Sequence, residues 1–435
     1  MTRTLIALVG GGAARTPAEP PAALHPLLGR PLLEHVLQAA RPLDADPPRV
    51  VAGPGHHRLV AEFLDAHAPS AVPVRQRGPR GAGQAVGAAL DTAADADGTV
   101  LVLTGDVPLL RSGSLLELAR AHEDSGAAAT VLTGAAPVAH AFDARVLRAA
   151  LSGLRRRGGE RAQSLADLVG AVRTAGHEVR THPLADPAEA LRCRDQVRLA
   201  EARAVLRERI NRGWLERGVA IIEPAATWID ATVELTAGVT VEPGVHLRGR
   251  TTVAARAVIG PDTTLEDTEV GPGARVVRAH AVGARIGAGA DVGPYAYLRP
   301  GADLGPRTRV GAFVEVKESV LGAGTQVAHL AYVGNATLGA DVNIGAGTTF
   351  SLYDGVAKHA TQVGDAAFIG CNTSLVAPVQ VGAGAFVAAG SVVTERVPSG
   401  SLAVGRARQV NKPGWVARRR PGTVWAAAAG SASAD

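Results

Sequence analysis

Five residues whose side chains titrate, carry positive charge or donate hydrogen bonds are spaced through residues 292–353, and they are the candidates for the chemistry of this chain. They are Arg299, Lys317, His329, Tyr332 and Asn343. They do not form a contiguous motif, because they interrupt a regular series of aliphatic residues. What they can do together therefore depends on the element that this series forms.

The aliphatic residues of this stretch recur at a period of six. They lie at Val292, Leu298, Leu304, Val310 and Val316, then after a five-residue step at Leu321, Val327 and Val333, and after another at Leu338 and Ile344. Neither a helix nor a single flat strand has this period. It predicts a coil of short parallel strands that turns a corner about every six residues and points one aliphatic side chain per strand inward.

The same period extends to both sides of this stretch. It begins at Leu235, Val241, Leu247, Val253, Ile259 and Leu265, continues after one slip at Val270, Val276 and Val282, and resumes at Val363, Ile369, Leu375, Val381, Val387 and Val393. Residues 349–362 interrupt it and are expected to form a loop that leaves the coil. With three strands per turn, the series predicts about nine coils.

Composition agrees with a β-solenoid. The 435 residues include 52 glycines, which suit its corners, and only 3% aromatic residues, which suits a narrow interior. Two cysteines, Cys193 and Cys371, make no disulfide framework and favour a reducing compartment. The net charge of +5 is modest. Arg155–Arg157 and Arg418–Arg420 lack interleaved aromatic residues, so we interpret them as solvated and expect phosphorylated small molecules, not nucleic acid, as ligands.

No membrane segment is predicted. No run approaches the ~18 apolar residues of a membrane helix, and the opening LIALVGGGAA reads as a buried strand and its turn, not as a signal peptide. We therefore expect a soluble, cytoplasmic protein without a membrane partner.

The part of the chain before the hexad series has a different pattern of predicted secondary structure. Residues 1–185 alternate between predicted strands such as RVVAG and TVLVLT and predicted helices such as PLLEHVLQAAR, which favours a parallel sheet with helices on both faces. Ligands of such sheets bind at the carboxyl ends of strands, where two Gly-rich turns and Asp106 lie. A nucleotide site is predicted there.

Residues 186–217 have helical spacing and predict a connecting helix, and residues 413–435 predict a disordered tail.

Several motifs in one register resemble a known family. YLRPGADLG, GAFVEVKES, HLAYVGNATLG, NIGAGTTF, YDG and RARQVNKPGW follow in order. They are similar to the bifunctional N-acetylglucosamine-1-phosphate uridylyltransferase/glucosamine-1-phosphate N-acetyltransferase family of bacterial cell-wall precursor synthesis. The resemblance implies an α/β Rossmann-like nucleotidyltransferase domain over 1–185, a helix over 186–217 and a left-handed parallel β-helix acetyltransferase domain over 218–412, assembled as a homotrimer.

The resemblance also implies a role for each matched residue of the β-helix. His329 takes the place of the general base that deprotonates the sugar amine, and Glu315 is a candidate to orient it. The matched sugar-phosphate positions are Arg299, Lys317, Tyr332, Asn343 and Lys358. The matched acetyl-CoA positions are Ala346, whose N–H could stabilise an oxyanion, and Tyr353, Cys371, Ala389 and Arg406.

Two departures fall on the acetyl-CoA side. Leu352 stands where the family has Asn, and Cys371 where it has Ser. Loss of the amide costs on the order of 1–3 kcal/mol if a partner is left unpaired. We therefore expect weaker binding of CoA or another acyl donor.

The N-terminal half departs further. Its Gly-rich loop is GGGAARTP, in which Gly11 and Arg15 match nucleotide-binding positions, as Gln76 and Gly81 do further on. Ala22, however, replaces a phosphate-binding Lys. Asp106 matches a Mg²⁺ ligand, but the second ligand, an Asn, falls in the RCR of 192–194 and is absent. One carboxylate organises Mg²⁺ and UTP poorly. We therefore expect the uridylyltransferase half to be degenerate, with UTP a doubtful substrate and Mg²⁺ bound only if that site works.

These observations favour an acetyl-CoA-dependent N-acetyltransferase acting on glucosamine 1-phosphate or a close aminosugar phosphate. Two alternatives remain open: a fully bifunctional enzyme that also makes UDP-N-acetylglucosamine with Mg²⁺, and a non-catalytic binding or regulatory homologue. A zinc site from His280, His329 and His359 is disfavoured, because their separations resemble no compact ligand cluster.

Overall fold

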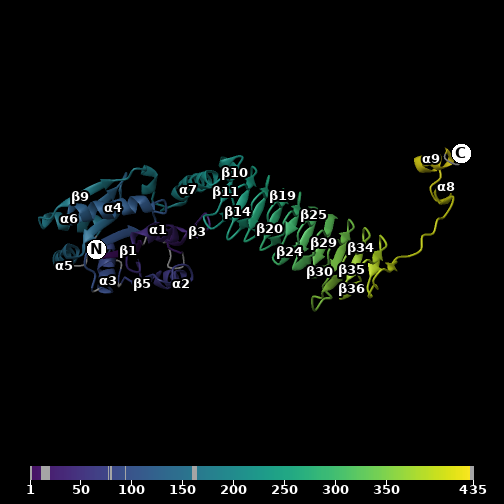
Figure 1. The fold of residues 1–435 in the computed structure, drawn as a ribbon, viewed down its shortest axis with the longest axis horizontal. Coiled ribbons are helices and arrows are strands. Elements are labelled where there is room, and N and C mark those ends of the chain that lie inside the picture. Colours follow the sequence, from purple (N-terminus) through teal and green to yellow (C-terminus); the bar gives the residue numbers. More distant parts are fainter. Residues whose placement is uncertain are drawn as a thin grey trace. The chain divides into compact units, whose positions relative to one another are not determined.

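The computed structural model describes residues 2–10, 20–76, 78, 81–93, 95–158 and 164–431 (Figure 1). The chain divides into two compact units, Met1–Arg285 and Ile286–Asp435. In the described part of the chain, no helix is both long and apolar enough to cross a membrane. The matched residues Gly11 and Arg15 lie outside the described residues.

The first unit begins with a seven-stranded sheet whose strand order is β5-β4-β1-β6-β8-β7-β9. The strands are β1 (Arg3–Val9), β4 (Arg49–Ala52), β5 (Val72–Arg75), β6 (Thr99–Thr104), β7 (Ala129–Thr133), β8 (Pro137–Asp143) and β9 (Val179–Pro183), beside a small hairpin of β2 (Pro26–Leu27) and β3 (Arg30–Pro31). The sheet is not entirely parallel as predicted, because β8 runs antiparallel to both β6 and β7.

Helices follow the strands, as the alternating pattern predicted. They are α1 (Leu32–Ala40), α2 (His57–His67), α3 (Gly81–Asp91), α4 (Ser112–Ser125), α5 (Ala144–Gly158) and α6 (Leu165–Thr174), with 3₁₀ turns at Ala22–Leu24 and Arg41–Leu43. Strand β6 buries five of its six residues between hydrophobic clusters on both faces. Burial on both faces is what a continuous apolar run such as TVLVL requires.

The connecting helix α7 (Gln196–Glu216) is shorter than the predicted 186–217. It begins at Asp195, whose carboxylate caps it by accepting from the Arg198 N–H at 2.8 Å, and a 3₁₀ turn at Pro187–Ala190 precedes it. Its buried Asn211 donates to the carbonyls of Pro224 and Thr227 at 2.9 and 3.0 Å. The first coil thus packs on α7, and both belong to the first compact unit.

The first unit contains the first strands of a parallel β-helix. One sheet holds β10 (Ala220–Ile221), β13 (Thr240–Val241), β16 (Val258–Ile259) and β19 (Arg275–Val276); another holds β11 (Trp228–Ile229), β14 (His246–Arg248), β17 (Thr264–Glu266) and β20 (His280–Val282); a third holds β12 (Glu234–Leu235), β15 (Thr252–Val253) and β18 (Glu269–Val270). A 3₁₀ turn at Pro224–Ala226 separates β10 from β11, and β21 (Arg285–Ile286) contains the boundary between the units.

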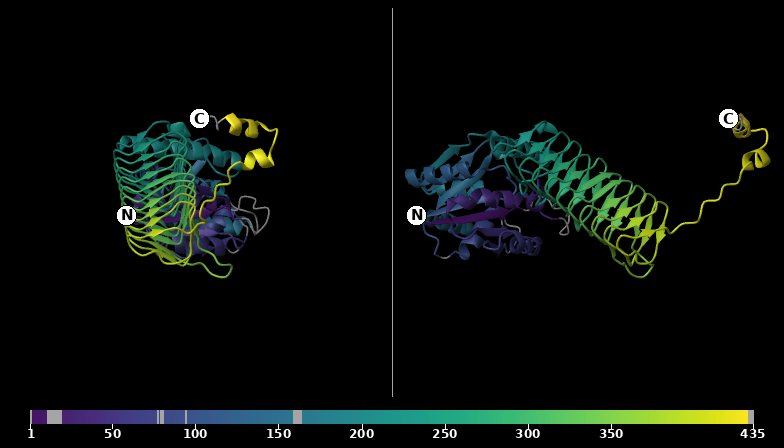
Figure 2. Two further views of the ribbon diagram at one scale, coloured as in Figure 1. Left: turned by 90° about the vertical axis from the view of Figure 1, so that its right-hand side faces the viewer. Right: turned by 45° about the vertical axis from the view of Figure 1, so that its right-hand side comes forward.

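In the second unit, short strands stack coil upon coil in three parallel sheets (Figure 2). The first sheet holds β22 (Asp291–Val292), β25 (Arg309–Ala312), β28 (Gln326–His329), β31 (Asn343–Ile344), β34 (Phe368–Ile369), β37 (Phe386–Val387) and β39 (Leu402–Ala403); the second holds β23 (Tyr297–Leu298), β26 (Glu315–Lys317), β29 (Tyr332–Gly334), β32 (Thr349–Ser351), β35 (Ser374–Val376) and β38 (Val392–Val393); the third holds β24 (Ala302–Leu304), β27 (Ser319–Leu321), β30 (Ala336–Leu338), β33 (Thr361–Val363) and β36 (Val379–Val381).

The hexad residues form the interior of the coils, as predicted, with one exception. From Val292 to Val393 the aliphatic residues of the series are buried. In the first unit the inward residue of β20 is Ala281, which pairs with buried Leu265, whereas Val282 pairs with Glu266 and is half-buried. The prediction of Val282 was wrong because the coil takes a five-residue step after Val276, where an alanine fills the interior.

The structure describes two short helices up to residue 431 in the stretch 413–435, for which the sequence predicts a disordered tail. They are α8 (Trp415–Arg419) and α9 (Val424–Ser431), and their described residues are mostly exposed. The Arg420 guanidinium lies 5.4 Å from the centroid of the Trp415 ring, a cation–π contact that joins the end of α8 to its beginning.

Candidate functional site

In the first unit, the carboxyl end of β6 presents Asp106, as the sequence predicted. Gly105 precedes it, where a Cβ would meet the Ala23 methyl at 3.1 Å and the Leu33 side chain at 3.2 Å. The Asp106 carboxylate accepts hydrogen bonds from Arg192 Nη2 at 2.9 and 3.0 Å and from Arg192 Nε at 3.2 Å. Both oxygens of Asp106 therefore accept hydrogen bonds from the Arg192 guanidinium, a contact that the sequence patterns did not predict.

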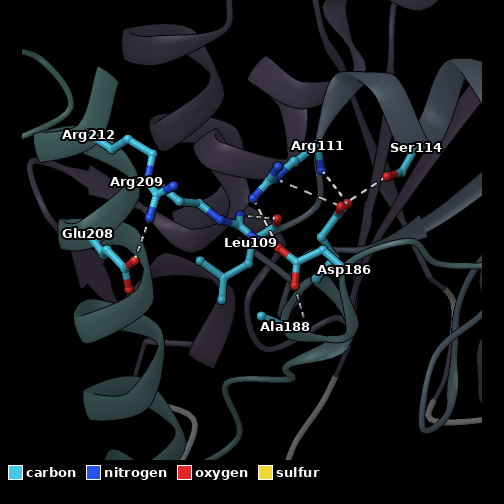
Figure 3. A network of polar contacts seen from close by, with 9 residues as sticks. Leu109, Arg111, Ser114, Asp186, Ala188, Glu208, Arg209 and Arg212 are labelled. Carbon is cyan, nitrogen blue, oxygen red and sulfur yellow. Dashed lines mark hydrogen bonds and ion pairs between the residues drawn. The ribbon is translucent and has the colours of Figure 1, made fainter. Parts of the chain in front are cut away.

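The segment that leads to Arg192 is held by a network of ion pairs (Figure 3). Asp186 accepts from Arg111 Nη2 and Arg209 Nη2, each at 2.9 Å, and Arg209 also donates to the Leu109 carbonyl at 2.6 Å. The buried Glu189 carboxylate accepts from the Arg111 N–H at 2.8 Å and from the Ser114 hydroxyl at 3.0 Å. A buried carboxylate with several donors fixes the segment firmly.

The other predicted nucleotide positions are only partly assembled. Gln76, just after β5, donates to the Gly81 carbonyl at 3.0 Å and to the Gln84 side chain at 3.2 Å, so the two matched residues Gln76 and Gly81 do meet. Ala22 begins a 3₁₀ turn and offers only a methyl group where the resemblance expects an ammonium. The lysine that the resemblance places at this position is absent from the sequence.

In the second unit, four of the matched sugar-phosphate residues gather on the second sheet. Arg299 follows β23, and its Nη1 donates to Glu315 Oε1 at 2.8 Å, one coil further on. This hydrogen bond raises the pKa of Arg299. Glu315 therefore holds Arg299, and among the described residues it makes no hydrogen bond to His329. The orienting role that we expected for Glu315 stays a prediction, and its ionic partner in the structure is Arg299.

Two lysines face each other beside this pair. The chain has only three lysines, Lys317, Lys358 and Lys412. The nearby Lys358 ammonium lowers the pKa of Lys317, whose side chain is only 18% exposed. Two ammonium groups repel each other unless an anion lies between them. Their juxtaposition, with Arg299 nearby, is the charge arrangement of an anion site such as one for a phosphate.

Tyr332 completes this cluster. Burial, followed by the negative charge of Glu315, raises the pKa of its hydroxyl, while the charges of Arg299 and Lys358 act in the opposite direction. Gly334 makes room for the ring, because a Cβ there would lie 2.6 Å from the Tyr332 hydroxyl oxygen and 2.5 Å from Leu352. Tyr332 is thus a protonated hydroxyl beside cationic side chains, suited to donate a hydrogen bond to an anion.

His329 ends β28 at the corner between the first and second sheets, and it is exposed. Its ring makes no hydrogen bond to any described residue, so either nitrogen is free to take a proton. One coil further on, the Gly347 N–H donates to the carbonyl of Leu330, the neighbour of His329, at 3.0 Å. The corner of Ala346 and Gly347 is therefore stacked on that of His329.

The matched acetyl-CoA residues continue this corner along the coil. The Asn372 N–H donates to the Ala346 carbonyl at 2.7 Å, and the Gly390 N–H to the Cys371 carbonyl at 2.8 Å. A Cβ on Gly390 would lie 3.8 Å from Cδ of Arg406. With parallel strands ~4.8 Å apart, the three coil steps from His329 to Ala389 span roughly 14 Å. The line suits an elongated ligand whose reactive end lies at His329.

The loop between β32 and β33 carries Tyr353 and Lys358 and is closed by Asp354, a residue that our sequence analysis did not single out. Tyr353 and Lys358 form an antiparallel bridge, and the Tyr353 hydroxyl donates to the Gly355 carbonyl at 2.8 Å. The Asp354 carboxylate accepts from the N–H groups of Val356 and Ala357 at 2.8 and 2.7 Å. His359 Nε2 lies 2.7 Å from its other oxygen. The pKa of Asp354 lies well below its usual range, mainly because of the two backbone N–H donors and in addition because of His359.

This arrangement predicts that Asp354 positions Lys358. In Asp354→Ala the loop loses its acceptors, so the amides of Val356 and Ala357 should exchange faster in hydrogen-exchange measurements. The KM for a sugar phosphate, the ligand that the resemblance implies, should rise by roughly 3- to 30-fold with a smaller change in kcat. Glu395→Ala, which removes an exposed carboxylate on a later coil, is the matched control. Unchanged exchange and KM in Asp354→Ala would contradict this role.

The two departures from the family's motifs have different settings. Leu352 is buried, and its carbonyl accepts from the His359 N–H at 2.8 Å, so it packs beneath the loop. Cys371 is exposed on the line of acetyl-CoA positions. Its N–H lies 2.5 Å from the position of a Cβ on Gly345, which explains the glycine at that corner.

One matched residue is not brought to the cluster. Asn343 lies on the first sheet, between Gln326 and Phe368 of neighbouring coils, whereas Arg299, Lys317, Tyr332 and Lys358 belong to the second sheet and its loop. Among the described residues, no group of three or more His, Cys, Asp or Glu side chains is placed to hold a metal ion.

Comparison with known proteins finds a family model in each half of the chain. Residues 5–209 match a family model described as MobA-like NTP transferase domain, and residues 360–395 match one described as Bacterial transferase hexapeptide (six repeats). The β-helix is thus of the left-handed, hexapeptide-repeat kind, and the preceding sheet is a nucleotidyltransferase domain of Rossmann-like type.

Full-length relatives are similar over nearly the whole chain. The bifunctional protein GlmU of Streptomyces coelicolor is 41% identical, over 99% of this chain and 97% of that protein. The bifunctional protein GlmU of Kineococcus radiotolerans is 42% identical, over 98% of this chain and 94% of that protein. The one of Corynebacterium glutamicum is 39% identical, over 98% of this chain and 96% of that protein.

Proposed function

Because the chain belongs to the family of the bifunctional protein GlmU, we propose that its β-helix transfers an acetyl group from acetyl-CoA to glucosamine 1-phosphate or a close aminosugar phosphate. The chain is a transferase with an acyltransferase and a nucleotidyltransferase domain. The observation that carries the proposed reaction is the pair Lys317 and Lys358 beside Arg299, a cationic site near the exposed histidine.

In this proposal, the sugar phosphate binds to Lys317, Lys358, Arg299 and Tyr332. His329 removes a proton from the sugar ammonium, and the amine then attacks the carbonyl carbon of the thioester. The backbone N–H of Ala346 donates to no described residue and is available to the oxyanion. The C–S bond breaks as the amide forms, and the CoA thiolate leaves and takes up a proton.

We propose in addition that the N-terminal half does not transfer UMP from UTP, although the relatives' name is bifunctional. Ala22 in place of a cationic residue supports this, since phosphoryl transfer depends on positive charge at the transferring group. Retained transfer, with Mg²⁺, is the alternative. The cytoplasmic location expected from the sequence stays a prediction.

The test is CoA thiol release by the purified protein with acetyl-CoA and glucosamine 1-phosphate, beside pyrophosphate release with UTP, Mg²⁺ and N-acetylglucosamine 1-phosphate. We expect thiol release that depends on the amine, and no pyrophosphate above the blank. If neither glucosamine 1-phosphate nor another aminosugar phosphate gave thiol release, the result would favour the non-catalytic homologue. Pyrophosphate release would mean a fully bifunctional enzyme.

We also propose that the protein acts as a homotrimer. Tyr295, Phe313 and Leu330 occupy successive coils at the corner beside His329 and are 54%, 61% and 64% exposed. The Tyr295 and Phe313 rings stack with centroids 5.4 Å apart. All three have positive φ, which is uncommon for non-Gly residues. An exposed apolar ridge of this kind favours a protein interface, and a neighbouring copy could bring its Asn343 to the site.

The ridge makes a testable prediction. Phe313→Glu should weaken self-association by at least about tenfold in dissociation constant, because it places a charge where the proposed trimer would bury an aromatic ring. Sedimentation velocity over a concentration series measures this. Phe386→Glu, in the exposed Phe368–Phe386 stack elsewhere on the first sheet, is the matched control. An unchanged distribution of species in Phe313→Glu would exclude this ridge as the interface.

A further inference from the structure

Arg192 donates hydrogen bonds to both carboxylate oxygens of Asp106, the only carboxylate that the family resemblance assigns to a metal. Its Nη2 lies 2.9 Å from Oδ1 and 3.0 Å from Oδ2 of Asp106, and its Nε lies 3.2 Å from Oδ2. Arg194 adds a second guanidinium, with Nε 3.7 Å from Oδ2. The Asp106 and Arg192 side chains are 18% and 26% exposed, so solvent screens this pair less than an ordinary surface pair.

The fold holds Arg192 in this position from both sides. The Cys193 N–H donates to the Asp106 carbonyl at 2.8 Å, and the Cys193 side chain is only 3% exposed, in a cluster with Leu27, Leu109 and Leu199. On the other side, the carboxylate of Glu189 is buried in the network with Arg111. Arg192 is thus built into the site.

A divalent cation does not fit this arrangement. Mg²⁺ requires about six oxygen ligands, including one or two carboxylates, and among the described residues no group of three or more His, Cys, Asp or Glu side chains is placed to hold a metal ion. His140 supplies no charge, because burial, followed by the charge of Arg192, lowers its pKa to about 4. Two guanidiniums facing one carboxylate leave net positive charge, which repels a second cation.

We propose that the Arg192 guanidinium takes the place of a bound metal ion beside Asp106, so that the carboxyl end of β6 excludes Mg²⁺. The diphosphate of a nucleotide then binds there through Arg192 and Arg194, without a metal ion. Arg192 Nη1 has no hydrogen-bond partner among the described residues, and the Arg194 side chain is 66% exposed. Both border a hollow of about 510 Å³. This inference deepens the proposed loss of UMP transfer and rests on the nucleotidyltransferase assignment of the domain.

The first experiment titrates Mn²⁺ alone into the full-length protein and counts bound ions by electron paramagnetic resonance. We expect the wild type and Asp106→Asn to bind alike, because Arg192 already occupies the carboxylate. Arg192→Asn should gain one Mn²⁺ site, and Asp106→Asn/Arg192→Asn should lose it. Arg212→Ala, which removes an exposed arginine paired with Glu208, is the control. A Mn²⁺ site in the wild type that Asp106→Asn abolishes would overturn the proposal, even if the Arg192 variants did not fold.

The second experiment measures UDP binding by calorimetry in EDTA and in excess Mg²⁺. We expect binding no tighter in Mg²⁺ than in EDTA, and a loss of about tenfold in Arg194→Ala, the effect of one charge-assisted hydrogen bond. Binding that requires Mg²⁺, or no binding under either condition, would overturn the proposed ligand. Neither experiment measures turnover, so failure of the proposed acetyl or UMP chemistry is seen separately in the thiol and pyrophosphate assays.

Discussion

In His329→Ala, acetyl transfer to glucosamine 1-phosphate should fall by about 10²- to 10⁴-fold in kcat, the contribution of a positioned general base. The thermal midpoint should hardly change, because the ring is exposed and makes no hydrogen bond to the described residues. The loss should shrink at high pH, since a larger share of the sugar amine is then already deprotonated. This pH dependence separates a lost base from a disturbed binding site.

The measurement is CoA thiol release over a range of pH, with circular dichroism to confirm the fold. His280→Ala, in which a histidine of another coil is removed, is the matched control and should retain wild-type rates. If His329→Ala kept its rate at neutral pH, the base would have to be another group. An equal loss at every pH would indicate a role in binding or structure.

The second large effect is expected at the lysine pair. Replacing Lys317 or Lys358 by Met should raise the KM for glucosamine 1-phosphate by about 10- to 100-fold each, as each lysine donates a charge-assisted hydrogen bond to the phosphate. Replacing one should also relieve the repulsion on the other and so reduce each single effect, which means that the double variant should lose more than the product of the two single effects. The KM for acetyl-CoA should stay nearly unchanged. Lys412→Met, which removes the third lysine of the chain, is the control.

The lowered pKa of Lys317 gives this prediction a second readout. In the free protein the neighbouring Lys358 favours the neutral form of Lys317, and a bound phosphate dianion favours the charged form. Binding of the sugar phosphate should therefore take up protons at pH values near the lowered pKa. Calorimetry in buffers of different ionisation enthalpy measures this uptake. Proton release, or equal heats in all buffers, would contradict the arrangement of the two ammonium groups.

The sequence alone determined the architecture and the identity of most candidate residues. The hexad period depends only on which residues in each short strand face inward, a local property, so it predicted the coil from Leu235 to Val393. It failed at Val282, where a five-residue step put Ala281 inside. Periodicity cannot tell such a step from a continued hexad when the inward residue is an alanine.

Only the tertiary structure decided which charges meet. The contacts of Lys317 with Lys358, of Glu315 with Arg299 and of Asp106 with Arg192 join segments that are separate in the chain. The RCR of 192–194 showed that an Asn was absent, but not that its arginine reaches back to the carboxylate. The physical reason is that the period fixes which way a side chain points, whereas an ion pair depends on the neighbouring coil, strand end or loop that reaches it.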